Sequence, residues 1–315
     1  MPRLQDLDVS GNNVTRLDFL QAGDDGPPPV LTVLDVSRNA LRALPRNTFA
    51  RTPALQILDL SANRLSALRA PVLAPLRHLE RLSLAHNQLR DLPPDTLNHS
   101  AVLETADLSH NLLANLSFMR SPSLQLLDLS FNRVHTLDGG VFVRVPALKH
   151  LDLGDNEISF IDPMAFAGLR GLQYLNLAMN SISQLPDLFI KPMKSLKVLS
   201  IARNKLSTLT DFTFAVTSVS ELMELDMSGN RLSAIHPHAF QYLSELRMLN
   251  LSFNQIKQLD KNTFCGNIEL TEFDLSENIP ETSFRLEFAT PMLARTALIK
   301  ILNSYFGGSH VATKE

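Results

Sequence analysis

One pattern, LxxLxLxxNxL, recurs twelve times along this 315-residue chain and constrains its fold more than any other feature. Most successive asparagines of the pattern are 24 residues apart. A unit of this size cannot bury its own leucines, so each must stack on its neighbours, which predicts a solenoid. The repeated asparagines are Asn12, Asn39, Asn63, Asn87, Asn111, Asn132, Asn156, Asn180, Asn204, Asn230, Asn254 and Asn278.

The leucines of each unit predict a short strand. Leu58 and Leu60 alternate with Ile57 and Asp59, which is the period-2 pattern of a strand with one inward face. Strands about 4.8 Å apart on one side, with bulkier turns on the other, bend such a stack into an arc. We therefore expect an α/β solenoid with a curved parallel sheet on its concave side and an irregular convex side.

The repeats predict the domain organisation. Residues 1–283 form the repeat array, and residues 284–315 belong to no repeat. Within this tail, Met292 to Phe306 has the apolar spacing of one amphipathic helix. The tail either lies across the last coil as that helix or comes from a truncated or alternative reading frame.

The asparagine column requires a structural reason. A buried polar side chain costs about 1 to 3 kcal/mol unless it is hydrogen-bonded. The two donors and the acceptor of an asparagine amide can bond the backbone of the adjoining turns. We therefore interpret the whole column as structural.

A second apolar column lies ten residues after many of these asparagines, often with a proline or aspartate just upstream, as in the segment LPRNTF that ends at Phe49. Together the two columns resemble the 24-residue subclass of leucine-rich repeats typical of extracellular proteins. The resemblance implies that the second column forms a stacked hydrophobic spine on the convex side. Its members are Phe49, Leu73, Leu97, Phe142, Phe166, Ile190, Phe214, Phe240 and Phe264.

Two irregular steps interrupt the period. The 27-residue step contains the turn-rich insertion from Gly23 to Pro29, which is expected to bulge from the array. The 21-residue step between Asn111 and Asn132 lacks a residue at the spine position.

Composition excludes several classes of protein. The 44% hydrophobic and 19% charged residues exclude a disordered polyelectrolyte, and a net charge of −3 gives no general reason to bind nucleic acid. The lone cysteine, Cys265, excludes an internal disulfide framework and a zinc finger, and we expect it to be a buried or half-buried filler. No cofactor is expected. The chain contains no apolar run long enough to span a membrane and no signal peptide.

The ends lack the cysteine-rich caps that close secreted members of the family. The simplest hypothesis is that the chain is an internal portion of a longer extracellular or cell-surface protein, with self-association through its uncapped ends. Four glycosylation sequons give this only weak support, because chance alone predicts nearly as many. They begin at Asn13, Asn98, Asn115 and Asn250.

No catalytic motif is present, so we predict that the chain is not an enzyme. His86 and His110 occupy equivalent positions in adjacent coils and are interpreted as solvated surface residues, with a shared metal site as the alternative. The position before the third framework leucine is mostly aspartate, for example Asp59 and Asp107. These aspartates are expected to bond neighbouring backbone or serine groups, with calcium or a basic partner as the alternatives.

The remaining outward positions vary from repeat to repeat, as a recognition surface should. Among the middle coils they form an apolar and aromatic cluster with an arginine at its edge, which is typical of a protein-binding surface. For Phe131 and its equivalent Phe253, burial within the stack is an open alternative. The predicted partner-binding residues are Leu126, Phe131, His150, Tyr174, Met179, Val198 and Arg203.

The repeat period, the LPxxxF-like turns and the LDLSxN strands are most similar to the ectodomains of Toll-type receptors and chaoptin-like adhesion proteins. That resemblance implies recognition of a protein ligand or co-receptor, in the ligand-binding or adhesion segment of an extracellular receptor. The alternative is an intracellular leucine-rich-repeat scaffold or regulatory subunit, favoured by the missing signal peptide and the scarcity of cysteine.

Overall fold

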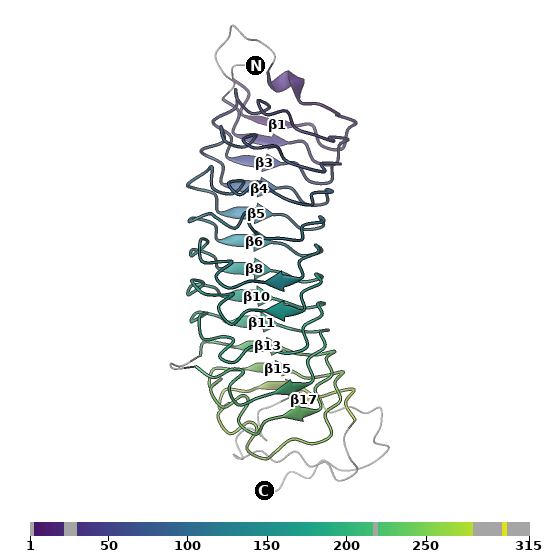
Figure 1. Cartoon of the computed structure of the whole chain (residues 1–315), viewed down its shortest axis with the longest axis vertical. Coiled ribbons are helices and arrows are strands. Elements are labelled where there is room, and N and C mark those ends of the chain that lie inside the picture. Colours follow the sequence, from purple (N-terminus) through teal and green to yellow (C-terminus); the bar gives the residue numbers. More distant parts are fainter. Residues whose placement is uncertain (1–2, 22–29, 217–219, 280–297, 301–315) are drawn as a thin grey trace. The chain divides into compact units, whose positions relative to one another are not determined.

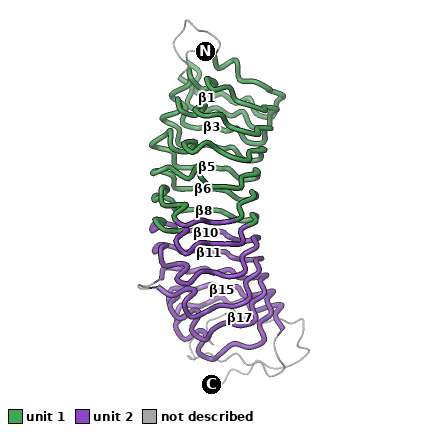
Figure 2. Tube along the Cα trace, in the orientation of Figure 1, with its two compact units in different colours: residues 1–135, 140–157, 166–169 green, residues 136–139, 158–165, 170–315 purple. Residues whose placement is uncertain are grey.

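The computed structural model describes residues 3–21, 30–216, 220–279 and 298–300. The chain divides into two compact units, coloured separately in Figure 2. Unit 1 comprises residues 1–135, 140–157 and 166–169, and unit 2 comprises residues 136–139, 158–165 and 170–315. The predicted insertion from Gly23 to Pro29 and most of the predicted tail lie outside the described residues.

Unit 1 contains one parallel sheet whose strands follow one another in chain order, as Figure 1 shows. Each strand has three residues and comes from one of the predicted repeats. The only helix among the residues described in either unit is the 3-10 helix η1, Asp18–Leu20. The strands are β1 (Asp6–Asp8), β2 (Val33–Asp35), β3 (Ile57–Asp59), β4 (Arg81–Ser83), β5 (Thr105–Asp107), β6 (Leu126–Asp128) and β8 (His150–Asp152).

Unit 2 has the same architecture. Its main parallel sheet consists of β10 (Tyr174–Asn176), β11 (Val198–Ser200), β13 (Glu224–Asp226), β15 (Met248–Asn250), β16 (Glu272–Asp274) and β17 (Leu298–Lys300). Unit 2 also contains two short parallel pairs outside this main sheet. They are β7 (Thr136–Leu137) with β9 (Phe160–Ile161), and β12 (Thr208–Leu209) with β14 (Ala234–Ile235). The predicted leucine-rich-repeat solenoid is thus confirmed, with turns rather than α-helices opposite the sheet.

The sheets are in strict register, which follows from the repeat. Leu58 pairs with Leu34 and Leu82 in unit 1, and Leu225 pairs with Leu199 and Leu249 in unit 2. These central leucines point into the core and are at most 2% exposed. The residues on either side point outward and are half-buried or exposed. A shift by one residue would bring the outward set into the core, so burial of the leucines fixes the register.

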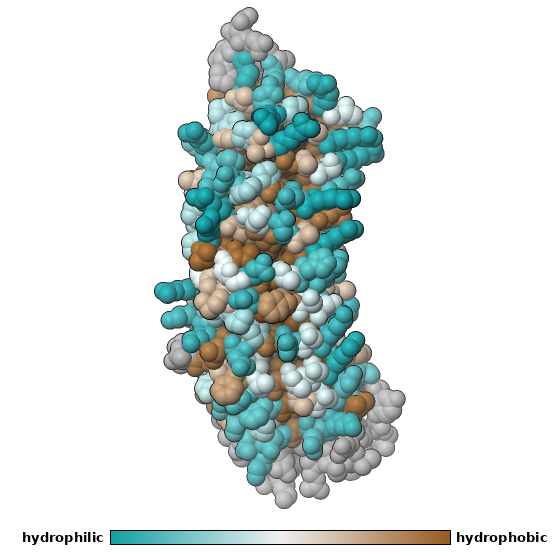
Figure 3. All heavy atoms as spheres, viewed as in Figure 1, coloured by the Kyte–Doolittle hydropathy of each residue, from teal (hydrophilic) through white to brown (hydrophobic). Residues whose placement is uncertain are grey.

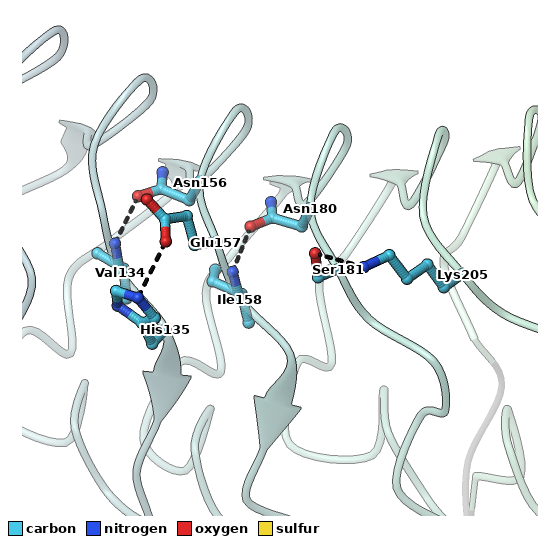
Figure 4. Close-up of polar contacts among 8 residues, drawn as sticks. All are labelled: Val134, His135, Asn156, Glu157, Ile158, Asn180, Ser181 and Lys205. Carbon is cyan, nitrogen blue, oxygen red and sulfur yellow. Dashed lines mark hydrogen bonds and ion pairs between the residues drawn. The ribbon is translucent and has the colours of Figure 1, made fainter.

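The asparagine column is structural, as predicted. The amide nitrogen of Asn63 donates to the carbonyls of Leu60 and Ser61 in its own turn and to Val36 in the preceding coil. Its Oδ1 accepts from the N–H of Leu41, 2.9 Å away. Figure 4 shows the equivalent bonds from Val134 to Asn156 in unit 1 and from Ile158 to Asn180 in unit 2. Each buried asparagine therefore ties one coil to the coil before it.

The turn that holds each asparagine requires an unusual backbone. The residue just before it has a positive φ in all twelve repeats. Most L-residues adopt this left-handed conformation at a cost of about 1 to 2 kcal/mol. The cost is offset by the asparagine bonds and by the ladder of backbone bonds, such as Ala62 N–H to Ala85 O. We call these residues the turn row: Gly11, Arg38, Ala62, His86, His110, Phe131, Asp155, Met179, Arg203, Gly229, Phe253 and Glu277.

The hydrophobic spine is also confirmed, since every predicted member is at most 4% exposed. In unit 1 the rings of Phe142 and Phe166 stack with centroids 5.8 Å apart. In unit 2 Phe240 lies between Phe214, at 6.1 Å, and Phe264, at 6.0 Å.

Four details of the structure either differ from the sequence-based predictions or decide between their alternatives. The short 21-residue step does contain a fully buried aromatic ring, Phe118, seven residues after its asparagine. Cys265 is exposed, whereas Thr263 and Phe264 just before it in the turn are buried. Phe131 and Phe253 are 46% and 62% exposed, since the left-handed turn directs their side chains away from the core.

The fourth detail concerns the tail. Of the helix predicted from Met292 to Phe306, only Leu298–Lys300 is described, and these residues form β17 rather than a helical turn. Their backbone pairs in parallel with β16, matching Phe273 with Ile299. The edge of a parallel sheet offers unpaired N–H and C=O groups, and this pairing satisfies them in a way that a local helix cannot. The helix prediction is therefore wrong for these three residues.

Candidate interaction face

The exposed face of each sheet carries three rows of side chains. The first residue of every strand forms one row, the third residue forms a second, and the turn row forms the third. Backbone geometry places equivalent residues of successive coils side by side, about 5 Å apart. Over the side of the molecule drawn in Figure 3, hydrophobic and hydrophilic residues are interspersed.

The second row is the predicted aspartate row, and it is structural. Asp59 Oδ1 accepts from the N–H of Ser61 at 2.8 Å, and Asp226 does the same for Ser228 at 2.9 Å. At Asp8 the bonds from the backbone and side chain of Ser10 lower the pKa of the carboxyl group, because they favour its charged form. Asn176 and Asn250 accept equivalent bonds. The aspartates thus cap the turns that lead to the left-handed residues.

In unit 1 the structure brings together three of the predicted binding residues. Leu126 and His150 are register partners on β6 and β8, and Phe131 follows β6 in the turn row. Leu126 is 36% exposed, and His150 is half-buried. Partial burial lowers the pKa of His150, although Asp152 and Asp128 act in the opposite direction. His150 is therefore biased toward its neutral form.

Unit 2 holds the other four predicted binding residues. Tyr174 and Val198 are register partners on β10 and β11. Met179 and Arg203 occupy successive positions of the turn row. Gly229 follows, and a Cβ there would meet Arg203 Cγ at 3.0 Å, so the arginine side chain lies against the glycine backbone.

Two exposed residues on the unit 2 face were missing from the predicted set. Met248 continues the first row beyond Glu224 and is 41% exposed, and Phe253 continues the turn row. Met248 lies three coils beyond Tyr174, and Phe253 lies two coils beyond Arg203. The repeat period in the sequence predicts both positions.

The turn row of unit 1 also contains a column of three stacked rings, which we call the ring column: His86, His110 and Phe131. The centroids of His86 and His110 are 3.9 Å apart with planes 12° apart, and those of His110 and Phe131 are 4.1 Å and 9° apart. Burial, and next the neighbouring His86, lower the pKa of His110, while Asp128, Asp107 and Asp155 act in the opposite direction. The two histidines lie at the surface, His86 exposed and His110 half-buried, and they stack on each other there.

This geometry does not suit the alternative of a shared metal. Imidazole lone pairs lie in the plane of the ring, so two rings that face each other do not point both nitrogens at one ion. Among the described residues no group of three or more histidine, cysteine or acidic side chains is placed to hold a metal ion.

The four candidate glycosylation sites differ in their solvent exposure. Asn13 and Asn115 are exposed, whereas Asn98 and Asn250 are half-buried. Asn250 lies on β15, where its Oδ1 accepts from both the N–H and the hydroxyl of Ser252. A glycan on Asn250 would cover the sheet face of unit 2.

A family model described as "Leucine rich repeat" matches residues 29–89, 77–134, 122–182 and 220–278, together more than half of the chain. The chain belongs to the leucine-rich repeat family. No curated protein sequence matches this member of the family significantly. Its fold supports a role as a protein–protein interaction module.

Solved structures share the fold. Toll in the Toll–Spatzle complex of Drosophila aligns with a TM-score of 0.73 and 22% identity, over 88% of this chain and 36% of that one. The internalin inlF of Listeria monocytogenes aligns with a TM-score of 0.65 and 20% identity, over 95% and 87%. A chain of the TLR13–ssRNA13 complex aligns with a TM-score of 0.57 and 22% identity, over 78% and 43%.

The repeat protein spans less than half the length of the Toll and TLR13 chains that it matches. The TLR13 structure is a complex with ssRNA13, so the fold alone does not exclude nucleic acid, and a protein-only partner stays a prediction. The family and fold are typical of binding modules rather than enzymes. Within the described residues, no helix has both the length and the apolar character needed to cross a membrane.

Proposed function

We propose that this chain is the ligand-binding or adhesion segment of an extracellular receptor and that it recognises a protein through the exposed sheet face. The observation that carries the proposal is the contrast between conserved geometry and changing side chains within one chain. The asparagines, inward leucines and capping aspartates repeat from coil to coil. The first strand row and the turn row change in size, charge and aromaticity at almost every step.

The outward residues have the chemistry of binding anchors. Leu126 and Phe131 in unit 1, and Met179 in unit 2, are between 36% and 46% exposed. Large apolar side chains left this accessible bury hydrophobic surface when a partner covers them. His150, Tyr174 and Val198 are half-buried and add flat surface, and Arg203 adds a charge-assisted donor.

A matched pair of substitutions in unit 2 tests the face. Met179→Asp places a charge in the turn row, and Met164→Asp makes the same change at a methionine that is 60% exposed in a turn outside the face. The chain would be screened as a soluble fusion against a library of purified extracellular proteins, and each hit would be measured by surface plasmon resonance. We expect Met179→Asp and Tyr174→Ala to weaken binding at least tenfold and Met164→Asp to leave it unchanged. Equal effects of the two methionine variants would refute the assignment of the face.

The cellular location needs a separate test, because the single exposed thiol of Cys265 also suits a reducing compartment and so favours an intracellular scaffold. The chain would be expressed in mammalian cells behind a heterologous signal peptide. An extracellular protein should be secreted and carry glycans at the exposed Asn13 and Asn115, removable by an N-glycosidase. Retention as an aggregate, with full solubility only after cytosolic expression, would favour the scaffold.

A further inference from the structure

Two successive coils of unit 1 carry an excess of positive charge. Residues 36–58 contain four arginines, residues 60–79 contain three, and neither segment contains an aspartate or a glutamate. The net charge of the whole chain is −3, so this excess is local. No lysine precedes Lys149, and the permanent positive charges of these coils are therefore all guanidinium groups.

Part of this charge forms a strip on the segment of each coil that follows the asparagine. Arg42 and Arg64 adjoin the fully buried Leu41 and Leu65, so their side chains point out of the coil. The N–H of Arg64 donates to the carbonyl of Leu41 at 2.8 Å, which places Arg64 in the coil next to Arg42. We define the arginine strip as five exposed residues of three successive coils: Arg42, Arg46, Arg64, Arg69 and Arg90.

A contact elsewhere in unit 1 shows how close such positions are. His135 and Glu157 stand three residues and one residue after the asparagines of two successive coils, and His135 Nε2 lies 2.9 Å from a carboxylate oxygen of Glu157 (Figure 4). Arg42 and Arg64 stand at the same two positions in an earlier pair of coils. Where the later coils place a histidine against a carboxylate, the strip places two guanidinium groups, which repel each other.

The strip has no counter-charge of its own. Among the described residues, none of its five guanidinium groups forms an ion pair or a side-chain hydrogen bond. Other arginines of unit 1 do have acidic partners, since Arg16 lies 2.9 Å from Asp18 and Arg120 lies 3.9 Å from Asp95. The charge of the strip is thus available to an anion from outside.

The acidic residues at the borders of the strip neutralise it only in part. Asp35 and Asp59 lie on the sheet and cap the turns there, each accepting from a turn N–H at 2.8 Å. Asp91 follows the last arginine of the strip, and its Oδ1 accepts from the N–H of Leu92 and the amide of Asn115. Residues 30–91 contain nine arginines against four acidic residues.

The strip also lacks the anchors that a folded protein or a single-stranded nucleic acid would use. Between residues 31 and 101, all of which the structure describes, no large hydrophobic side chain is exposed. The one phenylalanine of this segment, Phe49, is buried in the spine, and His86 belongs to the turn row rather than to the strip. Protein hot spots and base-binding surfaces are rich in aromatic side chains. A polymer that bears repeated anions and no large apolar groups needs none.

We propose that the arginine strip binds a sulfated polysaccharide of the glycosaminoglycan class. A guanidinium fork binds a tetrahedral oxyanion through two parallel hydrogen bonds, and such a polymer carries sulfate groups at short intervals. Arg42 and Arg90 stand two coils apart, about 10 Å by the coil spacing, so one polymer chain that crosses the coils meets successive arginines. The inference rests on the proposed extracellular role, because this class of polysaccharide is extracellular, and it concerns unit 1 alone.

Heparin, a heavily sulfated member of this class, tests the strip without any protein ligand. Binding of the full chain to immobilised heparin would be measured by surface plasmon resonance at several salt concentrations. Arg42→Ser/Arg64→Ser removes the two adjacent charges, and Arg16→Ser/Arg120→Ser makes the same change of charge at arginines that already have acidic partners. We expect at least about fivefold weaker binding for the first variant and less than about twofold for the second. Each strip arginine removed should lower the slope of log affinity against log salt by about 1.

Competitors identify the ligand class. Chemically desulfated heparin keeps its carboxylates and should compete at least about tenfold less well than heparin, because the sulfate groups are the proposed ligands. Single-stranded poly(U) RNA and a short DNA duplex carry phosphates and should also compete less well than heparin.

Four outcomes would overturn the proposal. They are no binding of the unchanged chain to heparin at physiological salt, equal weakening by the two double variants, equal competition by desulfated heparin, and tighter binding of either nucleic acid. The last outcome would assign the strip to a phosphate backbone instead. The proposed protein recognition stands or fails separately, because its test variant Met179→Asp lies in unit 2 and should leave heparin binding unchanged.

Discussion

The two units have one framework and different surfaces. Both stack their coils through buried asparagines and capping aspartates. The bonds accepted by Asn63 and Asn204 are each 2.9 Å long, and those accepted by Asp59 and Asp226 are 2.8 and 2.9 Å long. In unit 1 the turn row carries the ring column, and in unit 2 it carries Met179, Arg203 and Phe253. The buried residues therefore determine the shape of each coil, while the exposed rows are available for function.

A second contrast lies in the turns eight residues after each asparagine. In unit 2 three successive residues there, Met164, Leu188 and Phe212, are 60%, 37% and 56% exposed. The corresponding residues of unit 1 include Asn47, Pro71 and Asp95. The surfaces thus diverge away from the sheet as well.

The spine offers the largest expected effect. Phe240→Ala in unit 2 removes a ring packed between two others and should lower the free energy of unfolding by about 3 to 5 kcal/mol. Leu97→Ala in unit 1 removes fewer carbons and should cost about 2 to 4 kcal/mol. Denaturant titration would compare them. A cost below about 1 kcal/mol for Phe240→Ala would contradict the spine.

The asparagine column provides a direct test that the two frameworks are equivalent. Asn63→Ala and Asn204→Ala each remove one accepted and three donated bonds, leaving buried backbone groups unsatisfied. We expect each to cost about 3 kcal/mol in denaturant titration. If the two values differ by more than about 1 kcal/mol, the shared framework is energetically unequal.

The capping aspartates should matter less. Asp59→Ala in unit 1 and Asp226→Ala in unit 2 each remove one bond to a turn N–H and should cost about 1 kcal/mol. Asp→Asn at the same positions retains the acceptor, as Asn176 and Asn250 do naturally, and should be nearly neutral in thermal unfolding. Equal losses from alanine and asparagine would show that the charge, rather than the bond, is required.

The smallest effect is a pH dependence confined to unit 1, where the pKa values of His99, His110 and His150 are all lowered, chiefly by burial. Below the ordinary histidine pKa of 6.5 the unfolded chain binds more protons than the folded chain, so stability should fall as pH falls below that value. His110→Phe keeps a ring in the column and removes one titrating group. It should reduce the loss between neutral pH and about pH 5 by under about 1 kcal/mol, measured by denaturant titration at each pH. A larger loss of stability in His110→Phe than in the unchanged chain would contradict this prediction, because it would mean that protonation of His110 stabilises the fold.

The accuracy of the sequence predictions follows from what each residue depends on. The positions of the twelve repeat strands, the bonding of the asparagines and the burial of the spine were predicted because each depends on contacts that recur in the repeat. Phe118 and residues 298–300 were mispredicted, since they lie where the period is broken or has ended. Cys265 lies in a regular 24-residue coil, where the repeat predicts burial of the spine residue Phe264 but does not determine the exposure of the residue after it. The seven proposed binding residues remain predictions, although the structure places all of them on the exposed face or its turn row.

The sequence by itself determined the solenoid, its register and the structural asparagines, because burial of one leucine face allows only one alignment of each coil on the next. Only the tertiary structure showed that the residue before each of the twelve repeat asparagines is left-handed, that Phe131 and Phe253 project into solvent, and that His86, His110 and Phe131 stack as rings. The first two features depend on the backbone conformation of the turn, and the ring stack depends on side chains from different coils meeting at distances of about 4 Å. A one-dimensional pattern contains neither kind of information.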